Sequence, residues 1–172
     1  AVDGVDYAGA ITNCDQSYLY LGYALDRCDD EYGSIEPIPG ISGPVQVMEL
    51  VLVLVGSMDG DPSNDDVADE DASVTAGSGN GGGETVYRLR EGIERFLITD
   101  INNPAAGAMA QSELPVAWDI ISNDQSSSVE FNHIPGGCNV LFLDGHVAFQ
   151  RYPGDFPTSE NFAGMTAAFG SY

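Results

Sequence analysis

The sequence predicts a single α+β domain, and three observations carry this prediction. A chain of 172 residues fits one domain and is short for two. Apolar residues at helical spacing mark its first two thirds, whereas strand-like stretches follow in its last third. An Asp-Gly pair between two of these stretches predicts an antiparallel hairpin. We therefore expect residues 1–172 to form one compact unit of helices and strands.

Three segments carry patterns that favour helices. Apolar residues recur at helical spacing from about Ser17 to about Asp26, and again from about Thr85 to Ile98. The apolar run from Val45 to Gly56 is ambiguous, since its valines favour a strand whereas Pro44 and Glu49 favour a helix. We expect a buried helix there. The run is shorter than the ~20 residues of a spanning helix, so we expect no membrane span in this chain.

Strand patterns occupy Leu114–Ile121, Val140–Leu143 and His146–Gln150. Asp144 and Gly145 lie between the last two segments and predict a two-residue type I′ turn, in which both central residues have positive φ. We expect these strands to pair as a hairpin.

The charge balance restricts the possible partners. The chain has 27 acidic residues and 5 basic residues, all of them Arg, so its net charge is -22. Such a field repels phosphate backbones and anionic lipids, which argues against binding to nucleic acid or to a membrane surface. A hard cation with carboxylate ligands is the natural partner. The alternative is that the acidity only keeps a secreted protein soluble. For Arg88, Arg90 and Arg95, the structural role is pairing with the chain's own acidic surface.

Residues 59–83 form a long polar segment that is first acidic and then rich in glycine. Oxygen-bearing side chains stand at positions 1, 3, 5, 7 and 12 of a calcium-loop spacing. They are Asp59, Asp61, Ser63, Asp65 and Glu70. Two residues depart from the pattern, because Asn64 replaces the usual glycine and Asp66 replaces an apolar residue. The sequence predicts bound Ca²⁺ in this segment, with a solvated acidic loop as the alternative.

The chain has three cysteines, so at least one of them has no disulfide partner within the chain. Cys14 and Cys28 are close in the sequence, and a disulfide between them would stabilise the fold by roughly 3 kcal/mol in an oxidising compartment. Cys138 is then left over, and we expect it to be a buried small hydrophobe in a strand. The alternative is a cytosolic chain with three reduced thiols.

Both histidines flank Asp144, and two histidines with a carboxylate are a minimal transition-metal set. However, Asp144 is a turn residue, His146 starts the returning strand, and His133 precedes a Pro-Gly-Gly turn. The sequence shows no nucleophile beside a base and no phosphate-binding loop. We therefore expect a structural role for these residues, in which His133 hydrogen-bonds the backbone, and we expect no enzymatic activity.

The stretch "FNHIPGGCNVLFLDGHVAF" (Phe131–Phe149) resembles the C-terminal signature of the prepilin-type, processing-associated family that is named for a His, nine residues and Asp-Gly. The signature residues would be His133, Asp144 and Gly145. Here ten residues separate His133 from Asp144, one more than in the family pattern. The segments "YRLREGIERFLITDINNPA" and "YLYLGYALD" are also similar to members of this family.

The resemblance implies a pilin-like globular head, in which a small antiparallel β-sheet packs on helices, as in type IV pilins and type II secretion pseudopilins. Such proteins polymerise through an apolar N-terminal helix, which we do not find here because Ala1 onward is polar and acidic. Pseudopilin heads also use Ca²⁺ in acidic loops. We expect a secreted bacterial surface protein that self-associates as a structural subunit of a pilus-like or fibrillar assembly. The alternative is a secreted calcium-dependent module that binds glycans or proteins.

Overall fold

The computed structural model describes residues 18–57, 69–93, 111–121 and 136–170. Its elements follow in the order β1 (Tyr18–Leu19), η1 (Asp30–Tyr32), β2 (Ser34–Ile38), β3 (Ile41–Pro44), α2 (Val45–Ser57), β4 (Ala72–Ser73), η3 (Asn80–Gly82), β5 (Thr85–Val86), β6 (Pro115–Asp119), β7 (Gly137–Phe142), β8 (Val147–Arg151) and α4 (Glu160–Gly170). The two α-helices and the small antiparallel sheets of the described residues confirm the expected α+β class.

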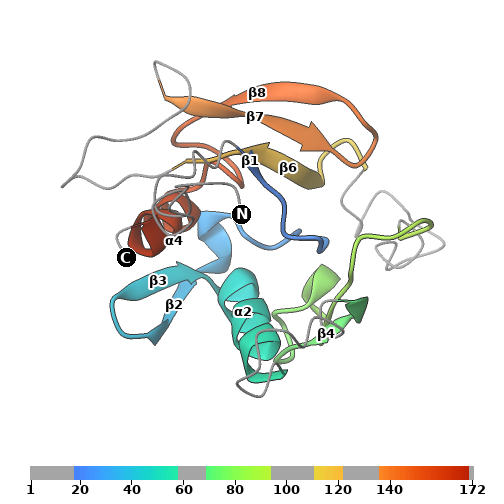
Figure 1. Ribbon diagram of the computed structural model, residues 1–172, viewed down its shortest axis with the longest axis vertical. Coiled ribbons are helices and arrows are strands. Elements are labelled where there is room, and N and C mark those ends of the chain that lie inside the picture. The colour runs from blue at the N-terminus through green and yellow to red at the C-terminus, as the bar shows by residue number, and fades with distance from the viewer. Residues whose placement is uncertain (1–17, 58–68, 94–110, 122–135, 171–172) are drawn as a thin grey trace, which may run out of the picture.

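The largest sheet has four antiparallel strands in the order β1-β6-β7-β8. It lies at one end of the longest axis of the molecule, and α2 lies at the other end, with α4 and the β2–β3 hairpin between them (Figure 1). Leu19 pairs with Trp118, Trp118 with Val140, and Val140 with Ala148. Directly paired residues share a face of the sheet, so this row defines the inner face, which packs on the core.

Three aromatic rings fasten α4 to the inner face of the sheet. The ring of Trp118 lies 5.0 Å from that of Phe156 and 5.6 Å from that of Phe162, and the rings of Phe156 and Phe162 are 4.9 Å apart, all in edge-to-face contact. On its other side α4 contacts β3, where a Cβ on Gly43 would stand only 2.7 Å from the sulfur of Met165. The absence of a side chain at Gly43 therefore lets helix and strand approach closely.

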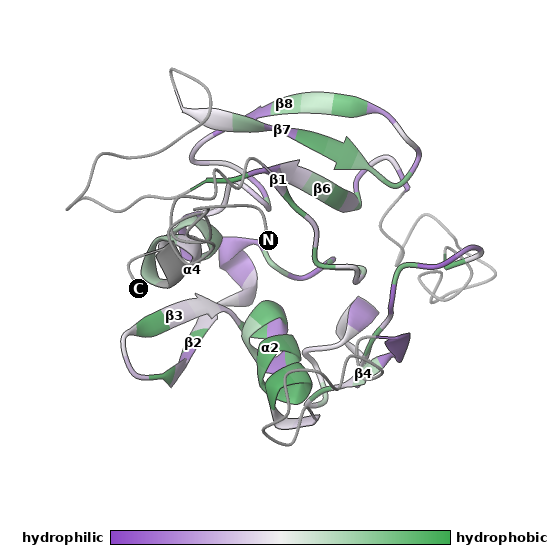
Figure 2. Ribbon diagram, in the orientation of Figure 1, coloured by the Kyte–Doolittle hydropathy of each residue, from purple (hydrophilic) through white to green (hydrophobic). Residues whose placement is uncertain are grey.

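The apolar run after Pro44 is helical, as expected, since α2 spans Val45–Ser57. Its burial is only partly as expected. Gln46, Val47, Met48 and Leu50 are buried, but the last turns of the helix expose aliphatic side chains (Figure 2).

The helix expected from about Ser17 to about Asp26 is wrong. This segment begins with β1 and continues as an extended chain that buries Tyr23, Ala24 and Leu25 in succession. Its backbone is bonded across the chain, because Ala24 N donates to the carbonyl oxygen of Tyr87 at 2.8 Å. Three consecutive buried residues do not fit one helical face, so this tertiary pairing overrides the local spacing.

The helix expected from about Thr85 to Ile98 is also wrong over its described part. Thr85 and Val86 form β5, which pairs with β4, and Leu89 N donates to the carbonyl oxygen of Gly22 at 2.8 Å. Residues 94–98 lie outside the described part of the chain. The Leu114–Ile121 prediction is confirmed by β6, and the two C-terminal strands are confirmed by β7 and β8.

The β7–β8 hairpin closes through a three-residue loop, Leu143–Gly145, rather than the two-residue turn that was expected. Phe142 N donates to the carbonyl oxygen of His146 at 3.0 Å, and Gly145 N donates to that of Phe142 at 2.9 Å. Gly145 has a φ of 89°. This is the pattern in which glycine in the left-handed region ends a three-residue loop.

Candidate functional site

The acidic segment lies largely outside the described residues, as Asp59, Asp61, Ser63 and Asp65 do. Only Glu70 of the predicted calcium ligands is described. Its side chain is exposed, and its carbonyl oxygen accepts a hydrogen bond of 3.1 Å from the hydroxyl of Tyr23. Over residues 18–57, 69–93, 111–121 and 136–170, no group of three or more His, Cys, Asp or Glu side chains is placed to hold a metal ion. The calcium site therefore stays a prediction.

Asp144 and His146 form a compact hydrogen-bonded unit in the loop between β7 and β8. Asp144 Oδ1 accepts from the backbone N of His146 at 3.0 Å and lies 2.6 Å from His146 Nδ1. These two hydrogen bonds, first from the backbone and then from the ring, lower the pKa of Asp144. The His146 ring also stacks on Phe142 with centroids 4.5 Å apart. Asp144 is thus a residue of the connecting loop, as expected. His133 lies outside the described residues.

The two described cysteines are buried thiols. Cys28 Sγ lies 3.3 Å from Gln46 Oε1, and burial raises its pKa well above the ordinary value, with further contributions from Asp26 and Asp29. Cys138 is buried in β7, as expected, and burial raises its pKa to about 12. Neither group is a thiolate nucleophile at neutral pH. Cys14 lies outside the described residues, so its pairing with Cys28 stays a prediction.

Two arginines pair with the acidic surface, as expected. Arg88 contacts Asp69 at 2.8 Å, and Arg90 contacts Asp71 at 2.8 Å. The Arg88 backbone N also donates to Asp71 Oδ1 at 3.0 Å. These contacts fasten the extended segment after β5 to the start of β4.

A buried polar network, which the sequence reasoning missed, centres on Gln46 in the first turn of α2. Its Oε1 accepts from the backbone N of Asp26 at 3.0 Å and of Arg27 at 3.1 Å, and its Nε2 donates to Asp26 Oδ1 at 3.0 Å. Gln46 is only 1 % exposed. Gln46 is one of two polar residues in the apolar run from Val45 to Gly56, and this was the available signal, but the run did not reveal the partners of Gln46.

Asn80 extends this network from the glycine-rich segment. Its Nδ2 donates to Ala24 O and to Asp26 Oδ1, both at 2.8 Å, and its Oδ1 accepts from Tyr87 N at 2.8 Å. Gly81 N donates to Asp26 Oδ2 at 2.8 Å. Both carboxylate oxygens of Asp26 thus have structural partners, and the Gly-rich segment has a defined structure rather than that of a flexible connector.

Asp29 and Asp30 hold the start of α4. Asp29 Oδ1 accepts from Phe156 N at 2.5 Å, while the two oxygens of Asp30 accept from the backbone N of Glu160 and Asn161 at 3.1 and 3.0 Å. A carboxylate at a helix N-terminus satisfies amide groups that have no partner within the helix and interacts favourably with the helix dipole. Asp30 therefore caps α4 from a distant part of the chain.

A cavity of about 460 Å³ adjoins Asp29. Its lining residues also include the acidic Glu113 and Asp155 and the aromatic Phe142 and Phe156. His146 is not among its lining residues, and the Cys28 thiol that borders it is protonated. The described lining thus combines negative charge with apolar surface and offers neither an imidazole base nor a thiolate.

An apolar surface lies on the outer face of the sheet, and we call it the sheet patch. It consists of Leu141, Val147 and Phe149, which are 37 %, 63 % and 45 % exposed. Leu141 pairs directly with Val147, and Phe149 follows two residues along β8, so the three share one face. β8 also ends the order of the sheet, and in the described part of the chain no strand pairs with its outer edge. Alternation along β8 was visible in the sequence, but not which face would be exposed.

No protein-family model, no curated protein and no solved structure matches the chain. Among the described residues, no helix is long and apolar enough to cross a membrane.

Proposed function

We propose that the chain is a non-enzymatic structural subunit of an extracellular, pilus-like or fibrillar assembly. The sheet patch is the observation that carries this proposal. Contiguous exposed apolar side chains are typical of surfaces that bind other protein chains. The resemblance of Phe131–Phe149 to the prepilin-type signature supports a pilin-like head and a bacterial cell-surface location.

In this proposal Ca²⁺ acts on the charge of the molecule. Subunits with a net charge of -22 repel one another, and this repulsion opposes close packing. Calcium bound by the acidic segment after Met58 would neutralise part of the charge and would stabilise each subunit by mass action.

A second candidate is a secreted module that binds a glycan or another protein with calcium, and the cavity beside Asp29 favours it. Its volume of about 460 Å³ is within the usual range for ligand sites. The buried Oε1 of Gln150, which also borders it, has no hydrogen-bond partner in the described part of the chain. Such a module would work as a monomer.

Sedimentation velocity and negative-stain imaging of the 172-residue chain, with and without CaCl₂, test the proposal. We expect the wild type to form oligomers or fibres that dissociate in EDTA. Val147→Asp places a charge in the sheet patch and should give monomers. Ser42→Asp adds the same charge at an exposed position of β3 and should assemble as the wild type does. A wild type that stays monomeric in both conditions would exclude the assembly function and favour the binding module.

A further inference from the structure

A second exposed apolar surface lies on α2, and we call it the helix patch. It consists of Leu52 and Val55, which are 42 % and 62 % exposed. Residues three apart lie on one face of a helix, so these two side chains are neighbours. The rest of this half of the helix is also apolar, with half-buried Val51, Val53 and Leu54 beside the patch. A helix that is apolar all round normally has protein on every side.

The two patches lie at opposite ends of the molecule. The sheet stands at one end of the longest axis and α2 at the other (Figure 1), and Figure 2 shows apolar residues on both. The two surfaces are also different in kind, one being a strand pair and the other a helix. A contact between unlike patches of two copies leaves one patch of each kind unused at the ends. Copies joined in this way form an open-ended chain unless the rotation between successive copies closes a ring.

A positively charged side chain lies beside the sheet patch. Among the described arginines, Arg88 and Arg90 form ion pairs and Arg27 lies over the ring of Tyr32 at 4.3 Å. Arg151 is exposed at the end of β8, two residues after Phe149 and on the same face as the sheet patch, and it forms no ion pair with another described residue.

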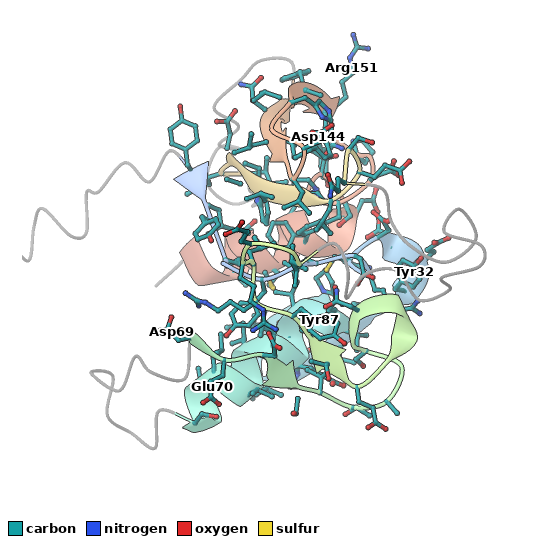
Figure 3. All side chains as sticks on the ribbon, turned by 90° about the vertical axis from the view of Figure 1, so that its right-hand side faces the viewer. Tyr32, Asp69, Glu70, Tyr87, Asp144 and Arg151 are labelled. Atoms are coloured by element: carbon teal, nitrogen blue, oxygen red, sulfur yellow. The ribbon has the colours of Figure 1, made fainter. Side chains whose placement is uncertain are left out.

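The opposite end carries an exposed carboxylate. Figure 3 shows Arg151 projecting at the end occupied by the sheet, with Glu70 and Asp69 at the end occupied by α2. Glu70 lies just before β4, which contacts α2, and Glu49 Oε2 of α2 accepts from Thr75 N at 2.7 Å. β4 packs against α2, so Glu70 lies at the same end of the molecule as the helix patch, whereas Arg151 lies beside the sheet patch (Figure 3). These two groups have opposite charges.

We propose that the helix patch of one copy packs on the sheet patch of the next copy, with Arg151 of the second copy facing Glu70 of the first. The inference rests on the proposed function and adds the partner surface and the direction of growth. Leu52 and Val55 supply the apolar contact with Val147 and Phe149. The Arg151–Glu70 pair favours the contact between unlike patches, because a contact between two sheet patches would bring two Arg151 side chains together.

Complementation between two blocked variants tests this inference. Val147→Asp blocks the sheet patch, and Val55→Asp blocks the helix patch. Each variant alone should remain monomeric at concentrations at which the wild type is polymeric. A 1:1 mixture should form dimers that do not grow, because the intact helix patch of one variant packs on the intact sheet patch of the other. Near-ultraviolet circular dichroism, which reports on buried Trp118, checks that both variants are folded.

A charge exchange tests the orientation. Arg151→Glu should raise the concentration needed for assembly by roughly fivefold, and Glu70→Arg should do the same. The double variant Arg151→Glu/Glu70→Arg should assemble at a lower concentration than Glu70→Arg alone, which lacks the same predicted calcium ligand. Arg90→Glu changes an arginine that already pairs with Asp71, and the Glu70→Arg substitution should not rescue any effect that it has.

The outcomes separate the two proposals. A wild type that never assembles overturns the proposed function itself. If the wild type assembles but the Val55→Asp variant dimerises alone, the sheet patches contact each other and the head-to-tail contact is wrong. A mixture of blocked variants that stays monomeric, or a double charge variant that is not rescued, also overturns the head-to-tail contact and leaves the assembly function standing.

Discussion

The carboxylate of Asp29 accepts a structural hydrogen bond from Phe156 N, yet its burial disfavours the charged form. Burial raises its pKa above the ordinary value of 3.8, and the neighbouring charges of Asp155, Glu31 and Asp30 raise it further. The hydrogen bond from Phe156 N acts in the opposite direction. Since the pKa is higher in the folded chain than in the unfolded chain, this group favours folding below its unfolded pKa. That contribution is lost as the pH rises through the folded pKa.

Asp29→Asn should therefore raise the Tm at about pH 7, because the amide keeps an acceptor for Phe156 N and removes a buried charge. The gain should disappear near pH 3, where the wild-type carboxyl is also neutral. Thermal unfolding across this range measures the difference. Asp155→Asn removes a nearby exposed charge and should give a smaller gain. A lower Tm of Asp29→Asn at neutral pH would mean that the charged hydrogen bond to Phe156 outweighs the burial.

Gly137 is needed where β7 begins, because a side chain there has no room. A Cβ would stand 2.2 Å from the carbonyl oxygen of Gln150 and 2.8 Å from the ring of Phe149, and φ is +153°. We expect Gly137→Ala to cost about 1–3 kcal/mol in the free energy of unfolding and to disturb the sheet patch. Gly56→Ala in α2, where nothing lies within 4 Å, should be neutral or stabilising by about 0.5–1 kcal/mol. Urea unfolding compares them, and equal effects would refute this account.

At the scale of the elements, the sequence predicted the hairpin correctly and favoured α2. It did not predict the extended conformation of the two segments around Tyr23 and Tyr87, for which we expected helices. Asp-Gly acts through local backbone angles, so two residues suffice to place the β7–β8 loop. Pro44 likewise favoured a helix start at α2, against the strand preference of the valines that follow. The segments around Tyr23 and Tyr87 have helical spacing, yet they pair with each other, as the hydrogen bond from Ala24 N to Tyr87 O shows. Burial on both sides and the contacts of Gln46 and Asn80 decide their conformation.

The docking of α4 on the sheet depends on the aromatic cluster around Trp118. Trp118→Ala removes the edge-to-face contacts with Phe156 and Phe162 and leaves a cavity, so we expect a loss of about 3–5 kcal/mol in the free energy of unfolding. Tyr18→Ala, at a residue that is 72 % exposed, should change stability by less than about 0.5 kcal/mol. Denaturant unfolding followed by far-ultraviolet circular dichroism measures both. A similar cost for the two variants would contradict the packing described above.

At the scale of the whole molecule, calcium is expected to stabilise the fold. At a concentration 100 times Kd, binding adds about 2.7 kcal/mol, which raises the Tm of a chain of this size by roughly 5–10 °C. EDTA should reverse the increase, whereas NaCl at the same ionic strength should not reproduce it. Asp61→Asn combined with Asp65→Asn should abolish the response. An unchanged melting temperature in excess chelator would remove calcium from the proposal and leave the apolar contacts.

The sequence by itself determined the α+β class, the β7–β8 hairpin and the strongly acidic surface, because each follows from local chemistry or composition. It favoured the helix after Pro44 but left a strand as the alternative. It also marked Cys138 as buried and Asp144–Gly145 as a loop. Only the tertiary structure decided which apolar faces are covered. Alternation along β8 is the same whether Val147 faces the core or the solvent. In the folded chain, Ala148 shares the inner face with Trp118, which packs against α4, and Val147 therefore lies on the outer face. Burial is a property of long-range packing, so the sheet patch and the helix patch became visible only in the folded chain.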